Sequence, residues 1–160
     1  MNIWKKILGI SLAVGLSVSM GIVPVYADTI SVLDEITDEE TTEDFAEDTS
    51  SILARSSNLN YGNVKIQRVS SNEIAIYGFT QCHRKCSKVY LSLFLERKVN
   101  GSYGTYKIWE FTANNVTSLS KEIDVAVPSG TYYRVRGYHA ASQSGRKEST
   151  STLTSGIMVK

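Results

Sequence analysis

The sequence has few of the residues that define several protein classes. Two cysteines, two prolines and eleven glycines among 160 residues exclude disulfide-dense, collagen-like and low-complexity chains. His83 and His139 are the two histidines, and the chain lacks Gly-x-Ser-x-Gly, His-Glu-x-x-His and phosphate-loop motifs. We therefore expect no enzyme, no metal site and no cofactor. A hydrolase in which a serine, His139 and Glu148 converge is an open alternative.

The one long apolar run lies at the N-terminus. Lys5 and Lys6 precede it, it extends from residue 7 to residue 25, and Val25 and Ala27 occupy the −3 and −1 positions of a cleavage site. This pattern predicts a secretory signal peptide over residues 1–27 and a secreted protein, extracellular or associated with the cell wall. An uncleaved anchor of about 20 residues is the alternative. No membrane partner is expected after cleavage.

Charge is distributed very unevenly along the chain. Residues 28–50 contain ten Asp and Glu but no Lys or Arg, whereas residues 51–160 contain fifteen Lys and Arg against six Asp and Glu. Because residues 28–54 have too few large apolar side chains to repay the entropy of ordering, we expect a disordered acidic pro-segment or linker there. Leu53-Ala54-Arg55-Ser56 is a candidate protease site. Its cleavage would leave a basic domain over residues 55–160, attracted to anionic polymers.

The basic part alternates between apolar and polar residues. Val89, Leu91, Leu93 and Leu95 fall on one face of a strand that ends in Asn100-Gly101, a pair typical of a tight hairpin turn. Strands are predicted over 63–69, 73–81, 88–99, 103–111, 117–127, 131–140 and 150–159. Their spacing predicts an all-β fold, an antiparallel β-sandwich of about seven strands. We assign four large aromatic side chains to its core: Phe79, Phe94, Trp109 and Phe111.

Two family resemblances add to this reading. The run from Thr131 to Ala140 resembles a strand of immunoglobulin-like and fibronectin type III domains, and this implies that Tyr133 bonds back across the preceding corner, with Val135 facing inward. A second resemblance, to small secreted proteins of clostridia and related Gram-positive bacteria, implies export but no activity. It rests on the leader, the acidic stretch and four motifs: Leu59-Asn60-Tyr61-Gly62, Cys82-x-x-x-Cys86, Leu95-Glu96-Arg97 ahead of Asn100-Gly101-Ser102, and Tyr132-Tyr133-Arg134-Val135-Arg136-Gly137.

Cys82 and Cys86 enclose three residues. In an exported chain this pair predicts a disulfide that closes a small loop. Redox motifs have two intervening residues, and haem attachment needs Cys-x-x-Cys-His, so neither is indicated. A zinc site built from Cys82, His83, Cys86 and His139 is the alternative.

Two groups of residues are candidates for ligand binding. Arg84, Lys85 and Lys88 lie in or beside the cysteine loop. Four more share one face of a predicted strand and would stack on sugars or hold phosphates if exposed: Tyr132, Arg134, Arg136 and Tyr138. Alternatively, those four pair across strands with Glu96 and Glu110.

Together these features predict a secreted, non-catalytic module that binds an anionic cell-wall polymer or glycan. The alternatives are an antibacterial or toxin-like protein with an acidic propeptide, and a cell-wall hydrolase. Nucleic acid is not an expected partner, because the chain is exported and has no recognised nucleic-acid-reading motif.

Overall fold

The computed structural model describes residues 40–50 and 56–160, which are almost entirely β-strand. The predicted signal peptide and the rest of the acidic segment lie outside these residues. Within them, no helix is long and apolar enough to cross a membrane. The seven strands are β1 (Phe45–Thr49), β2 (Leu59–Ser70), β3 (Glu73–Val99), β4 (Ser102–Ala126), β5 (Thr131–Gln143), β6 (Arg146–Leu153) and β7 (Ile157–Val159).

The strands form one antiparallel sheet in the order β1-β2-β3-β5-β6, with β4 paired to β3 and β7 paired to β5. β3 and β4 make a long hairpin. Its turn is Asn100-Gly101, with φ angles of 53° and 86°, so the hairpin predicted from this pair is confirmed.

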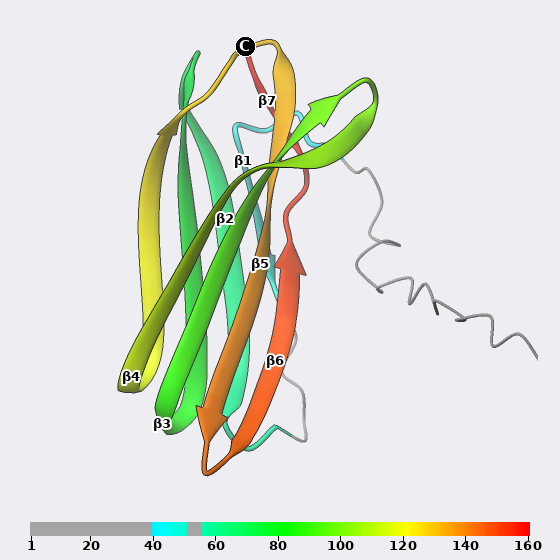
Figure 1. Cartoon of the computed structure of the whole chain (residues 1–160). Coiled ribbons are helices and arrows are strands. Elements are labelled where there is room, and N and C mark those ends of the chain that lie inside the picture. Colours follow the sequence, from blue (N-terminus) through cyan, green and yellow to red (C-terminus); the bar gives the residue numbers. More distant parts are fainter. Residues whose placement is uncertain (1–39, 51–55) are drawn as a thin grey trace, which may run out of the picture.

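The sheet is curled (Figure 1), and β3 changes one of its two partners along its length. Residues 73–82 pair with β2 and residues 88–97 pair with β5, whereas β4 accompanies β3 through both parts. A register shift between Gln81 and Cys86 separates them. We call the part of the sheet on one side of this shift the first half-sheet; it consists of β1, β2 and residues 73–82 and 118–126. The part on the other side is the second half-sheet; it consists of residues 88–99 and 102–116, β5, β6 and β7.

The core lies on the inner faces of the two half-sheets. Val89, Leu91, Leu93 and Leu95 are fully buried, as their alternation predicts. The half-sheets come close together at two glycines. A Cβ on Gly62 of β2 would lie 2.2 Å from the His139 ring, and one on Gly137 of β5 would lie 2.6 Å from Val64 Cγ1.

The all-β, antiparallel, seven-stranded prediction is confirmed, but the individual strands were partly mispredicted. β3 is one long strand where two were predicted, over 73–81 and 88–99. β4 is likewise one strand in place of the two predicted over 103–111 and 117–127. The predicted last strand is divided into β6 and β7, and β1 was not predicted. Trp109 and Phe111 pack against the core as expected, whereas Phe79 and Phe94 lie half-buried on the outer faces.

The prediction of disorder over residues 28–54 is wrong for residues 45–49, which form β1. β1 pairs along β2, and its carboxylates serve as hydrogen-bond acceptors. Asp48 Oδ2 accepts from the Leu153 amide at 2.8 Å, and Glu47 Oε1 accepts from the Asn63 side chain at 2.7 Å. Backbone pairing and these bonds supply the stabilisation that the apolar content does not.

Candidate functional site

The bend of β3 and the β5–β6 turn lie at the same end of the sheet (Figure 1, lower end). Two hydrogen bonds join them: the Ser87 amide donates to Gln143 Oε1, and Ser87 Oγ donates to the Ser142 carbonyl, both at 2.7 Å. Ser144 and Gly145 have φ angles of 51° and 77° and form the tight turn. Segments about sixty residues apart in sequence are thereby held side by side.

This end of the sheet carries a cluster of exposed cationic side chains. Three come from the bend of β3 and two from the start of β6, and we call them the basic end: Arg84, Lys85, Lys88, Arg146 and Lys147. The sequence pattern indicated the first three. It missed the last two, although the turn-forming pair Ser144-Gly145 directly before them was a usable signal.

Tyrosine rings support the two lysines of β3 and β6. Lys88 Nζ lies 5.1 Å from the centroid of the Tyr90 ring, and Lys147 Nζ lies 4.4 Å from the same centroid and 5.5 Å from that of Tyr138. Cation–π contacts of this kind restrain a flexible side chain without neutralising its charge. The predicted site residue Tyr138 therefore belongs to this cluster.

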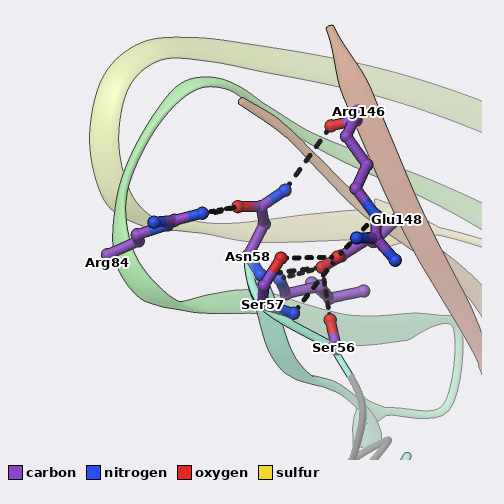
Figure 2. Close-up of polar contacts among 7 residues, drawn as sticks. Ser56, Ser57, Asn58, Arg84, Arg146 and Glu148 are labelled. Atoms are coloured by element: carbon purple, nitrogen blue, oxygen red, sulfur yellow. Dashed lines mark hydrogen bonds and ion pairs between the residues drawn. The ribbon is translucent and has the colours of Figure 1, made fainter. Parts of the chain in front are cut away.

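Glu148 fixes the segment that leads into β2 (Figure 2). Its carboxylate accepts hydrogen bonds from the amides of Ser57, Asn58 and Leu59 at 3.1, 2.8 and 2.9 Å, and from the hydroxyls of Ser56 and Ser57. Desolvation alone would raise the pKa of Glu148, but the bonds from Ser56 and the three amides together lower it well below its ordinary value.

Asn58 links that segment to both arginines of the basic end (Figure 2). Its Oδ1 accepts from Arg84 Nη2 at 2.9 Å, and its Nδ2 donates to the Arg146 carbonyl at 3.5 Å. Arg146 Nε also lies 3.5 Å from Glu148 Oε1. Because Asn58 is buried and bonded on both sides, it holds the two arginine-bearing segments in a fixed arrangement.

The other predicted site residues lie elsewhere. Arg134 Nε and Arg136 Nε lie 2.7 and 3.0 Å from the two carboxylate oxygens of Glu96, which is buried. The cross-strand alternative is therefore confirmed for these arginines with Glu96. They also stack on rings, Arg134 on Tyr103 and Arg136 on Phe94.

Tyr132 is also separate from the basic end. It pairs with Met158 of β7, toward the opposite end of β5. The structure thus separates the predicted site residues. Four lie at the basic end or contact it, namely Arg84, Lys85, Lys88 and Tyr138, whereas Tyr132, Arg134 and Arg136 lie elsewhere on β5.

His139 is a core residue. Its Nδ1 lies 3.0 Å from Thr80 Oγ1 and its Nε2 lies 2.9 Å from Thr152 Oγ1, and burial lowers its pKa to about 4. Both ring nitrogens are engaged by threonines, so the proposed constellation of a serine, His139 and Glu148 is not assembled.

Cys82 and Cys86 are buried and are not joined to each other in this structure. Burial and the neighbouring Cys86 raise the pKa of Cys82 to about 12, and Cys86 Sγ donates to the Arg84 carbonyl at 3.4 Å. The disulfide stays a prediction. No group of three His, Cys, Asp or Glu side chains in residues 40–50 and 56–160 could hold a metal ion. His139, bonded to Thr80 and Thr152, does not join the cysteines.

Comparison with curated proteins gives no match. A family of unknown function, DUF6147, matches residues 32–157. The match begins ahead of β1 and ends at the first residue of β7, so the family unit includes the strand in the acidic segment. Since it spans most of the sequence, the chain belongs to the DUF6147 family of unknown function.

Proposed function

We propose that this chain is a secreted, non-catalytic module that binds an anionic cell-wall polymer or glycan through the basic end. The observation that carries the proposal is the gathering of five exposed cations, from two distant segments, at one end of the sheet. Arginine presents a planar fork that matches phosphate and carboxylate groups, and lysine adds a mobile point charge. Such a surface suits a repeating anionic chain.

The arrangement of the basic end also favours binding. Asn58 fixes the segments that carry Arg84 and Arg146, and the Tyr90 and Tyr138 rings restrain Lys147. Less side-chain entropy is then lost when a ligand is bound.

Glu148 pairs with Arg146 within the basic end, but the ion pairs of the described acidic segment, residues 40–50, lie elsewhere. Glu40 pairs with Lys98 at 2.5 Å, and Asp44 pairs with Arg68. Among residues 40–50, no carboxylate forms an ion pair with the basic end. Residues 40–50 therefore leave the positive field at this end in place, which favours a binding module over a propeptide-masked toxin.

The test is binding to purified Gram-positive cell walls that retain their anionic polymers. We expect the triple variant Lys85→Glu, Lys88→Glu, Lys147→Glu to bind at least about tenfold more weakly than wild type, and wild-type binding to weaken as salt is raised. The matched control is the triple variant Lys107→Glu, Lys121→Glu, Lys160→Glu. It changes the net charge of the chain by the same amount, but at exposed positions outside the basic end, and it should bind like wild type. Salt-independent retention, or equal loss in both triple variants, would reject the proposal.

We further infer that the two half-sheets form a sandwich of the immunoglobulin-like or fibronectin type III kind. In support, the buried Tyr133 donates its hydroxyl to the Pro128 carbonyl at 2.8 Å, which is the corner bond that the resemblance implies. Val135 is fully buried beside it in the strand. A solved structure with a different strand connectivity would refute this.

A further inference from the structure

Three aromatic rings lie together on the outer face of the first half-sheet, and we call them the aromatic platform: Tyr61, Tyr77 and Phe79. The centroids of Tyr61 and Phe79 are 5.8 Å apart, and those of Tyr77 and Phe79 are 6.5 Å apart with their planes inclined by only 15°. All three are half-buried. Tyr61 is inclined by 54° to Phe79, so Tyr77 and Phe79 form a flat pair and Tyr61 forms an angled edge beside it.

The platform is not an extension of the core. Ile74 and Ile76, which alternate with these positions on β3, are fully buried and point inward. Tyr77 and Phe79 therefore face outward, away from the core. Exposed aromatic surface of this kind, bordered by polar groups, marks a binding site more often than a lone exposed ring does.

Polar side chains border the platform on both sides. The strand register places Glu47 of β1, Lys65 of β2, Tyr77 of β3 and Glu122 of β4 in one row across the sheet. A cavity of about 170 Å³ lies beside Tyr77, lined by Lys65, Gln67, Ala75, Ile76, Tyr77 and Glu122. A ligand on the rings would therefore meet carboxylate, amide and ammonium groups at its edges.

One border carboxylate, that of Glu47, is held in place. Asn63 Nδ2 donates to Glu47 Oε1 and to Thr49 Oγ1, both at 2.7 Å. Burial raises the pKa of Tyr77, and the nearby Tyr61, Glu122 and Glu47 raise it further, so its hydroxyl stays protonated as a hydrogen-bond donor.

The charge at this face differs from that at the basic end. Among the described residues in these rows, the border contains Glu47, Glu122 and, in the next row of β4, Asp124, against the cation of Lys65. An anionic polymer would be repelled here. A pyranose ring is different, because it presents an apolar C–H face to a flat ring and hydroxyl groups around its rim to polar side chains.

We propose that the aromatic platform binds an uncharged polysaccharide, whose sugar rings stack on Tyr61, Tyr77 and Phe79 while their hydroxyls bond to Gln67, Glu122 and Tyr77. This site is separate from the basic end and takes a different ligand. Two sites on one module would let it hold a wall bearing both kinds of polymer more tightly than either site alone.

The test is calorimetric titration of the full secreted chain with hexasaccharides of N-acetylglucosamine and of glucose. We expect at least one to bind, with little change between low and high salt. Tyr77→Ala should weaken binding about tenfold or more, and Tyr77→Trp, which keeps a stacking surface, should retain it. Tyr106→Ala is the matched control, because it removes an exposed tyrosine on the β3–β4 hairpin, distant in sequence from the platform.

Thermal unfolding of each variant separates loss of stacking from loss of the fold. Binding of neither sugar by folded wild type, or equal binding by folded Tyr77→Ala, would overturn the proposal. A change of oligomeric state in Tyr77→Ala without sugar binding by wild type would overturn it too, since the face would then be a self-association surface. The Lys85, Lys88 and Lys147 triple variant should bind the sugar normally, so failure of either proposal can be recognised independently.

Discussion

At the scale of single residues, His139 illustrates how burial decides chemistry. Thr80 Oγ1 donates its one proton to the Tyr90 carbonyl at 3.1 Å, so His139 Nδ1 must carry a proton and donate it to Thr80. Nε2 is then left as an acceptor for Thr152. Two threonines thus fix a neutral imidazole in one tautomer, and the ring serves as a polar element of the core.

This arrangement predicts a pH dependence of stability. The pKa of His139 falls from its ordinary 6.5 to about 4 in the folded chain. Between these values the unfolded chain binds a proton that the folded chain does not, so stability is lost as pH falls from about 6.5 toward 4. We expect urea denaturation to give a free energy of unfolding about 2 kcal/mol lower at pH 5 than at pH 7.

The matched variant is His139→Gln, whose amide can both donate and accept between the two threonines but does not titrate. Its free energy of unfolding should change much less over the same pH interval. Parallel pH profiles for wild type and His139→Gln would show that another group is responsible.

At the scale of strands, the alternation of apolar and polar residues predicted most of the strands. It did not predict where two of them join into one longer strand. The leucines of residues 91–95 identified the inner face of β3 correctly. The polar run after Cys82 indicated a loop, because its side chains do not alternate with apolar ones. The backbone nevertheless stays extended through the bend, where the hydrogen bonds are supplied by partners remote in sequence, such as the Asn58 carbonyl that accepts from the His83 amide at 2.9 Å.

Glu148 is the strand-scale feature with the clearest consequence. Its carboxylate accepts three consecutive amides at the start of β2, and an amide side chain presents only one acceptor oxygen. We expect Glu148→Gln to lower the free energy of unfolding by about 2 kcal/mol or more at pH 7, because charged hydrogen bonds are lost at a largely buried site.

Glu110→Gln is the control, since Glu110 is an exposed residue of β4. It should change stability by less than about 0.5 kcal/mol. Equal stability of Glu148→Gln and wild type in urea denaturation would mean that the segment before β2 is held by other contacts.

At the scale of the whole molecule, the described part of the acidic segment, residues 40–50, and the basic body are parts of one folded unit. Glu40 reaches Lys98, Asp44 reaches Arg68, and Asp48 bonds to β6. Cleavage at Arg55 would separate β1 from the chain while leaving it bonded to β2 and β6. Because β1 contributes a strand and a buried Ala46, its loss would expose the edge of β2.

We therefore expect the protein recovered from culture medium to begin at Asp28 and to retain residues 28–54. Intact mass spectrometry measures this directly, and a disulfide between Cys82 and Cys86 would lower the mass by that of two hydrogen atoms relative to the reduced sample. An N-terminus at Ser56 would contradict retention, and free thiols in the recovered protein would contradict the disulfide.

The sequence by itself determined the all-β, antiparallel class, the inner faces of the main strands, the Asn100-Gly101 turn and the sign of the charge on each part, because these depend on local periodicity and composition. Only the tertiary structure decided which charges lie together. Arg84 and Arg146 meet at Asn58, Arg134 and Arg136 are paired by Glu96, and β1 completes the sheet. Each of these results from pairing between distant segments, which a one-dimensional pattern does not encode.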